Sequence, residues 1–238
     1  MYLVRNIRCT CETVCSPAAF NRIGERTPFP KHDSILVMHD VVIIGAGPVG
    51  LACGIEAKRR GLSARIIDKG ALCNSFIGYP TRMEFFSTPR PLEIGGYPFP
   101  TRDYKPRRED ALDYYRRVAV AEELDIRLYE RVTNLKGTPQ DYTVAHNVVV
   151  ATGFYDIPNR LGVPGEELDK VSPYFKEPYP YALQDVAIVG AGNSAAKAAL
   201  ACHRTDANVT MIIRDDAIDD GVKYWIKPDL QNRIDEGS

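Results

Sequence analysis

The chain has 238 residues, of which 45% are hydrophobic and 26% are charged, and its formal net charge is −1. This composition is typical of a folded globular protein, and the length suits one large domain or two small ones. Proteins that bind nucleic acid or anionic membranes usually carry an excess of basic residues, and this chain has none. No run of about 18 apolar residues occurs that could cross a bilayer. We therefore expect neither a nucleic-acid partner nor a membrane partner.

Residues 1–37 differ in character from the rest of the chain, because they contain three prolines, mixed charges and no sustained hydrophobic period. No apolar core follows a basic start, so the segment does not resemble a signal peptide. Met38 stands directly before the first apolar run. We expect residues 1–37 to be a disordered arm or the product of an upstream mis-start.

Six cysteines are present, and three of them, Cys9, Cys11 and Cys15, crowd this first segment. No Cys/His pair follows at the spacing of a zinc site, so we expect no metal. The scattered positions of the others do not form a disulfide framework. A reducing cytoplasm is the simplest compartment for such a chain.

From Asp40 onward the pattern indicates a dinucleotide-binding unit. The apolar run Val41–Ile44 predicts a buried parallel strand, and the loop Gly45-Ala46-Gly47-Pro48-Val49-Gly50 follows at once. Leu51–Arg60 predicts a helix, and Ala64–Ile67 predicts a second strand that closes on Asp68. Strand, glycine loop, helix, strand and acid occur in the order of the dinucleotide-binding fingerprint.

Each part of this fingerprint has a physical role. Gly45 permits the tight turn, Gly47 lets the backbone approach a pyrophosphate, and Gly50 lets the helix pack closely on the strand. The helix N-terminus offers free N–H groups and a positive dipole end to the phosphates. A carboxylate at Asp68 is placed to bind a ribose hydroxyl. The residues expected to contact this cofactor are Gly45, Gly47, Pro48, Val49, Gly50, Asp68 and Lys69.

The same pattern recurs about 145 residues later. Val186–Val189 predicts a strand, Gly190–Ala195 is the glycine loop, Ala196–Cys202 predicts a helix and Asn208–Ile213 a strand. Here the strand is followed by Arg214 in place of an acid, and an arginine can pair with the 2′-phosphate of NADPH.

A solvated surface arginine is the alternative interpretation of Arg214, and Asp215 and Asp216 behind it weaken the preference for NADPH. Two units imply two nucleotides, and FAD with NAD(P)H is the usual pair, because a flavin accepts hydride from one partner and passes electrons to another. The residues expected to contact the second nucleotide are Gly190, Gly192, Asn193, Ser194 and Arg214.

The stretch between the two units carries further signals. Asn147–Gly153 predicts a strand that runs into an Ala-Thr-Gly turn, which resembles the motif that lies beside FAD in flavoproteins with two dinucleotide-binding domains. Thr152 and Gly153 are therefore expected cofactor contacts. The irregular stretch 69–108 is long enough to be functional and is placed to wrap the flavin. Arg108–Leu124 predicts an amphipathic helix.

Several short motifs outside the glycine loops resemble the bacillithiol disulfide reductase family, which are thioredoxin-reductase-like flavoproteins. The motifs are Tyr79-Pro80-Thr81, Phe85-Phe86-Ser87, Lys105–Arg108, Ala151–Tyr155, Tyr174–Glu177 and Trp225–Pro228. The resemblance runs from about Met38 to the C-terminus. It implies FAD in the first unit, NADPH in the second, and reduction of a low-molecular-weight thiol disulfide such as bacillithiol disulfide in the cytoplasm. Relatives of this class are commonly homo-oligomers.

Three departures from that family stand out. Val49 occupies a position where the family commonly has a cysteine, and Cys53, one turn further on, is either a substitute or a small buried hydrophobe. Unlike thioredoxin reductase itself, the chain also has no Cys-x-x-Cys before the second helix, so no redox-active cysteine and no other catalytic residue can be named.

The other two departures concern length. Only 24 residues follow Arg214, and the segment between Leu128 and Asn147 is short. We therefore expect a C-terminally truncated chain that holds FAD weakly and turns over poorly.

Two other functions compete with an NADPH-dependent flavin disulfide reductase. A flavin monooxygenase usually has Phe-x-Gly-x-x-x-His before the second loop, whereas Tyr174–Tyr179 has neither the glycine nor the histidine. A non-catalytic nucleotide-binding fragment is the other alternative. The fold we expect is α/β with two Rossmann-like units, an FAD domain over residues 38–160 and an incomplete NAD(P)H domain over residues 161–238.

Overall fold

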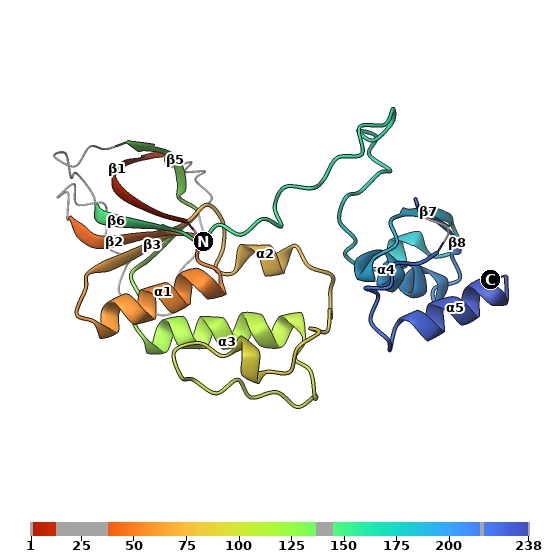
Figure 1. The fold of residues 1–238 in the computed structure, drawn as a ribbon, viewed down its shortest axis with the longest axis horizontal. Coiled ribbons are helices and arrows are strands. Elements are labelled where there is room, and N and C mark those ends of the chain that lie inside the picture. Colours follow the sequence, from red (N-terminus) through yellow and green to blue (C-terminus); the bar gives the residue numbers. More distant parts are fainter. Residues whose placement is uncertain (1, 13–37, 137–144, 215–216, 238) are drawn as a thin grey trace, which may run out of the picture. The chain divides into compact units, whose positions relative to one another are not determined.

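A computed structural model of the chain describes residues 2–12, 38–136, 145–214 and 217–237 (Figure 1). The chain divides into two compact units. The first runs up to Pro158 without Tyr79–Thr81, and the second consists of Tyr79–Thr81 and the chain from Asn159 onward. The α/β class with two Rossmann-like units that the sequence predicted is confirmed by these elements.

The described residues of the first unit form a six-stranded sheet in the order β4-β3-β2-β6-β1-β5. Its strands are β1 (Tyr2–Glu12), β2 (His39–Ile44), β3 (Ala64–Asp68), β4 (Ile126–Leu128), β5 (Arg131–Lys136) and β6 (Ala145–Val150). Strands β4, β3, β2 and β6 are parallel, whereas β1 pairs antiparallel with both β6 and β5. The parallel core is the nucleotide-binding arrangement that the apolar runs indicated.

Strand β1 differs from the arm without regular structure that we expected over residues 1–37. Leu3 lies opposite Val149 of β6, and Cys9 lies opposite Leu135 of β5. Backbone hydrogen bonds along β1 therefore pair an edge of β6 that would otherwise present free N–H and C=O groups. The sequence pattern missed this strand because edge pairing requires no hydrophobic period. Residues 13–37 lie outside the described residues.

Helices α1 (Pro48–Arg59) and α3 (Arg108–Ala121) lie on one face of this sheet (Figure 1). Leu51 and Ile55 of α1 are completely buried. A β-carbon at Gly54 would lie 2.8 Å from Cδ1 of Ile66 on β3, so this glycine allows the helix to approach the sheet closely. The opposite face of the sheet has its own apolar cluster. That cluster consists of Val42, Ile67, Ala145 and Val148, with Ile44, Val132, Leu135 and Val150 packed against it.

Two tyrosines of α3 hydrogen-bond to the long irregular segment that precedes this helix. The segment contains the short helix α2 (Asn74–Ile77) and the 3-10 turn η1 (Arg90–Leu92). The Tyr114 hydroxyl donates to the Tyr97 carbonyl at 2.8 Å, and the Tyr115 hydroxyl donates to the Leu92 carbonyl at 2.8 Å. The segment is thus fastened to α3 by buried hydroxyls that find backbone partners.

The second unit contains two parallel strands, β7 (Asp185–Val189) and β8 (Asn208–Ile212), with α4 (Asn193–His203), α5 (Lys227–Asp235) and the 3-10 turn η2 (Tyr179–Tyr181). Its core comprises Ala196, Ala199, Leu200, Ile218, Val222, Ile226 and Leu230, with Ile188, Val209 and Met211 packed against them. Helix α5 was not predicted, since its mean composition is polar and only Leu230 is buried. Among the described residues, no helix is long and apolar enough to span a membrane.

His39, at the start of β2, is a buried polar side chain that is 6% exposed. Neither of its ring nitrogens has a hydrogen-bond partner among the described residues. Burial lowers the pKa of His39, and Arg65 and Arg127 lower it further, while Asp125 and Asp40 act in the opposite direction. The folded protein therefore favours the neutral ring, because desolvation disfavours the charged form.

We expect this histidine to make the fold sensitive to mild acid. The unfolded chain takes up a proton below about pH 6.5 that the folded chain binds only at lower pH, so the free energy of unfolding falls in that range. One such group gives a slope of at most about 1.4 kcal/mol per pH unit. Urea unfolding of wild type and His39→Leu between about pH 7 and pH 5 measures the slope, which should be flatter in the variant.

The lowered pKa of carboxyl groups such as Asp40 does not obscure the effect. Their unfolded-state values lie near 4, so the stability that they contribute is lost only at lower pH. Equal slopes for wild type and His39→Leu would show that His39 is not the source of the acid sensitivity.

Candidate dinucleotide sites

The first glycine loop lies at the carboxyl ends of the parallel strands, between β2 and α1. Gly45 has a φ of +110°, and its N–H donates to the Ile67 carbonyl of β3 at 2.8 Å. A β-carbon at Gly45 would lie 2.4 Å from the carbonyl oxygen of Ala151, just after β6. Glycine is therefore required here for both its conformation and its contact. The same contact places the Ala-Thr-Gly turn beside the glycine loop.

Gly50 and Gly47 have different reasons to be glycine. A β-carbon at Gly50 would lie 1.8 Å from the Gly45 carbonyl oxygen, so the fold itself excludes any side chain there. A β-carbon at Gly47 would meet nothing within 4 Å. The φ of −82° and ψ of −179° at Gly47 are accessible to any residue. The described protein therefore gives no steric reason for glycine at this position.

The second loop repeats this geometry in the other unit. Gly190 has a φ of +132°, and its N–H donates to the Ile212 carbonyl of β8 at 2.9 Å. Gly192 has a φ of −84° and a ψ of −177°, within 2° of the angles at Gly47, and its β-carbon would also meet nothing within 4 Å. The two loops are thus the same backbone device.

Both loops open at the start of a helix. Gly47 and Gly192 are the N-cap residues of α1 and α4, and neither helix has a side-chain cap. Uncapped N–H groups and the positive dipole end favour an anion at each start. Open space above an unstrained glycine lets a phosphate group approach the backbone. Both loops therefore fit a pyrophosphate.

Asp68, expected to bind a ribose, is anchored to the first loop. One carboxylate oxygen accepts from the Ala46 N–H at 2.7 Å, and the other accepts from the Gly70 N–H at 2.9 Å. Each oxygen retains a further lone pair, so these bonds leave room for a hydroxyl donor. Asp68 thus ties the end of β3 to the glycine loop, and its contact with a ribose stays a prediction.

The structure brings together several further expected residues of the first unit. Lys69 forms an ion pair with Asp156 at 2.5 Å, and Asp156 also accepts from Ser75 Oγ at 3.4 Å. Asp156 follows the Ala-Thr-Gly turn by a few residues and was missed, because nothing local in the sequence identifies its partner. Thr152 and Gly153 are exposed beside the loop. Whether they contact a cofactor stays a prediction.

The remaining expected residues lie at the two helix starts. Pro48 occupies the first turn of α1, where its missing N–H has no helical partner to lose. Val49 is 53% exposed. In the second unit Ser194 and Arg214 are exposed. The Asn193 side chain hydrogen-bonds to the backbone of Gly221 and Lys223. The contacts of these expected residues with a nucleotide stay predictions.

The three cysteines whose side chains are described are free: Cys73 and Cys202 are buried, and Cys53 is partly buried. Burial raises the pKa of Cys73 to about 12, and the nearby Asp68 carboxylate adds to the shift. Burial also raises the pKa of Cys53 and of Cys202. A thiol needs its thiolate form to attack a disulfide, so these three are poor nucleophiles at neutral pH. The side chains of Cys9, Cys11 and Cys15 lie outside the described part.

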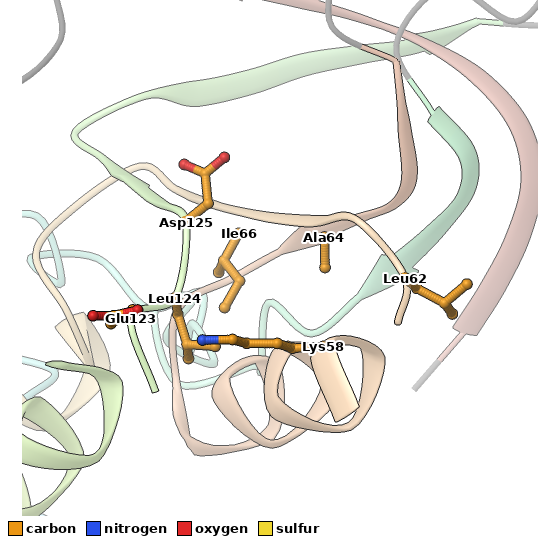
Figure 2. Close-up of a pocket in the computed structure, with 8 residues that line it drawn as sticks. Lys58, Leu62, Ala64, Ile66, Glu123, Leu124 and Asp125 are labelled. Carbon is orange, nitrogen blue, oxygen red and sulfur yellow. The ribbon is translucent and has the colours of Figure 1, made fainter. Parts of the chain in front are cut away.

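A small cavity of about 130 Å³ lies at the opposite end of the sheet from the glycine loop. Figure 2 shows Lys58 from the end of α1, Ala64 at the start of β3 and Asp125 before β4 around it. The starts of parallel strands are not where α/β folds bind nucleotides. Within the described residues, no group of three or more His, Cys, Asp or Glu side chains could hold a metal ion.

The fold and both loops agree with a comparison against protein families. Residues 42–238 match the family described as pyridine nucleotide-disulphide oxidoreductase. The chain belongs to this family, and the match covers both glycine loops.

Individual relatives show which members of this family the chain resembles. The bacilliredoxin reductase Bdr of Bacillus subtilis is 38% identical over 213 residues, which are 85% of this chain and 65% of that protein. The solved bacillithiol disulfide reductase Bdr of Bacillus cereus superposes with a TM-score of 0.79 at 38% identity, over 84% of this chain and 66% of that one. The resemblance that the motifs indicated is thereby confirmed. The chain spans slightly less than two thirds of the length of both reductases.

A different chemistry appears among the solved relatives as well. A flavin monooxygenase from Stenotrophomonas maltophilia superposes with a TM-score of 0.66 at 25% identity, over 84% of this chain and 68% of that one. The two-unit architecture is therefore shared by reductases and oxygenases.

Proposed function

We propose that this chain is an FAD-dependent oxidoreductase that couples NADPH oxidation to the reduction of a low-molecular-weight thiol disulfide, such as bacillithiol disulfide, in the cytoplasm. One observation carries the proposal. Gly47 and Gly192 adopt the same extended conformation at uncapped helix starts, and neither meets any protein atom that would exclude a side chain. A phosphate group that approaches each backbone supplies the missing reason for glycine.

The first unit fits FAD. The amides at the start of α1 would hold the pyrophosphate, and the Asp68 carboxylate would bind a ribose hydroxyl. Lys69, Thr152 and Gly153 surround the same edge of the sheet. When bound, FAD supplies a ring that accepts a hydride and passes electrons on one or two at a time.

The second unit fits a nicotinamide nucleotide. The amides at the start of α4 would hold its pyrophosphate, and Arg214 would pair with the 2′-phosphate that distinguishes NADPH from NADH. The net reaction is balanced as NADPH, one proton and one disulfide giving NADP⁺ and two thiols. Similarity to bacilliredoxin and bacillithiol disulfide reductases supports a small thiol disulfide as the acceptor.

The full chain with added FAD tests the proposal. We expect added FAD to give a protein-bound flavin absorption band that is partly lost during gel filtration, and slow NADPH oxidation under nitrogen that depends on bacillithiol disulfide. Oxidised glutathione serves as the matched disulfide control. A chain that takes up no FAD would instead support a non-catalytic nucleotide-binding fragment.

A flavin monooxygenase is the second candidate, supported by the 25% identical solved relative. A monooxygenase consumes oxygen in its reaction, whereas the proposed disulfide reductase needs none. NADPH consumption that stops under nitrogen, together with an oxygenated product in air, would replace the disulfide reductase with this function.

The raised pKa values of the cysteines give a separate prediction. We expect Cys53→Ala, Cys73→Ala and Cys202→Ala each to reduce the disulfide within about twofold of the wild-type rate, because burial disfavours the thiolate form of all three cysteines. Iodoacetamide at pH 7, followed by mass spectrometry, should leave Cys73 of the folded chain unmodified. A variant that still passes electrons from NADPH to a dye but no longer reduces the disulfide would identify its cysteine as a redox group.

A further inference from the structure

Asn193 connects the second glycine loop to a distant segment. Its side-chain Nδ2 donates to the Gly221 carbonyl at 3.0 Å, and its Oδ1 accepts from the Lys223 N–H at 2.9 Å. Asn193 is the first residue of α4 and follows Gly192 directly. The backbone of Gly221–Lys223 is therefore held within one side-chain length of the nucleotide site.

The segment itself is built to keep its shape. The Asp219 carboxylate accepts from the Gly221 N–H at 2.6 Å, and the Val222 N–H donates to the Asp219 carbonyl at 3.0 Å, which closes a tight turn. Val222 and Ile226 are 4% and 5% exposed and belong to the core beneath α4. The buried side chains of Val222 before Lys223 and of Ile226 after it thus hold this stretch of backbone in place, while Lys223 is itself exposed.

Position distinguishes Arg214 from Lys223. Arg214 follows β8, at the strand end that in this fold faces the adenosine ribose. Lys223 is fixed instead beside the first residue of α4, at the helix start where the pyrophosphate binds. A lysine is a flexible point charge that suits such a phosphate.

We propose that Lys223 contacts the pyrophosphate of the nicotinamide nucleotide and that Asn193 is the positioning residue that holds it there. This inference rests on the proposed function. Under it, Asn193 contributes to nucleotide binding through Lys223, and Arg214 alone reads the 2′-phosphate.

Calorimetric titration of the FAD-bound full chain with NADP⁺ and with NAD⁺ tests these separate roles of Lys223 and Arg214. We expect Lys223→Gln to weaken both ligands by the same factor of about ten, because one charge-assisted contact is lost and the 2′-phosphate is untouched. Arg214→Gln should weaken NADP⁺ only. Lys170→Gln, which alters another exposed lysine of the second unit, should change neither.

Two further measurements separate a charge contact from a structural role. Affinity for NAD⁺ should depend less on salt in Lys223→Gln than in wild type, because screening acts on the removed charge. Asn193→Ala should weaken both nucleotides, and adding Lys223→Gln to it should cost little more, since both changes remove one interaction. The exposed Lys223→Gln change keeps the backbone bond to Asn193, so its result stands even if Asn193→Ala unfolds.

The outcomes are distinct. Wild-type chain that binds neither nucleotide would overturn the proposed function together with this inference. Wild-type binding with an unchanged Lys223→Gln variant would overturn the inference alone. Loss of NADP⁺ binding without loss of NAD⁺ binding in Lys223→Gln would also overturn it, because Lys223 would then read the 2′-phosphate.

Discussion

Replacement of Gly47 by alanine is expected to weaken FAD binding roughly 10- to 100-fold while leaving the chain folded. The new methyl group meets no protein atom within 4 Å and suits the backbone angles at this position. It would stand in the space that the pyrophosphate needs to reach the amides of α1. The free energy of unfolding should fall by no more than about 1 kcal/mol, the usual difference between alanine and glycine at an N-cap.

Titration of FAD-free protein with FAD, followed by flavin fluorescence, gives the affinity, and urea unfolding without FAD gives the stability. Gly192→Ala is the matched control, because its backbone angles and open surroundings are the same in the other unit. It should weaken NADP⁺ and leave FAD binding unchanged. If Gly47→Ala binds FAD as tightly as wild type, the pyrophosphate does not approach at Gly47.

Replacement of Gly50 by alanine is expected to produce the opposite pattern, a loss of stability of about 3 kcal/mol or more. Its β-carbon would lie 1.8 Å from the Gly45 carbonyl oxygen and 3.0 Å from the carbonyl carbon. Backbone cannot rotate away as a flexible side chain can, so either the start of α1 or the turn at Gly45 must move. That movement would also break the contact between Gly45 and Ala151.

Urea unfolding of the FAD-free chain, monitored by circular dichroism, measures the effect, with Gly47→Ala as the reference for an alanine added to the same loop. Saturating FAD should recover only part of the lost stability, because the clash is present in the folded protein with or without ligand. A Gly50→Ala chain as stable as wild type would show that the loop adopts a different geometry.

Together the two substitutions separate a glycine that the fold requires from a glycine that a ligand requires. The distinction matters for function because sequence patterns treat both residues as one fingerprint. The duplicated angles at Gly47 and Gly192 extend the argument to the second unit, where no acid marks the nucleotide.

Much of the fold could be predicted from sequence because its signals are local. The strand, loop and helix around Gly45–Gly50 occupy consecutive residues, and so do those around Gly190–Ala195. Glycine conformations and apolar runs act over a few residues, so the sequence by itself determined two glycine loops of the dinucleotide-binding type and their place after parallel strands. The motifs outside the two loops likewise indicated the reductase relatives.

Only the tertiary structure showed which residues distant in sequence contact one another. The Asn193 side chain, expected at a nucleotide, bonds to Gly221 and Lys223. Asp156 forms an ion pair with Lys69, which lies far earlier in the chain. Strand β1 pairs with β6 through backbone groups that every residue carries. Such contacts leave no local pattern, because the hydrogen bonds join segments that are distant along the chain and that only folding brings together. The sequence alone therefore determined the two loops at which we propose that phosphates bind, and the tertiary structure decided which side chains surround those loops.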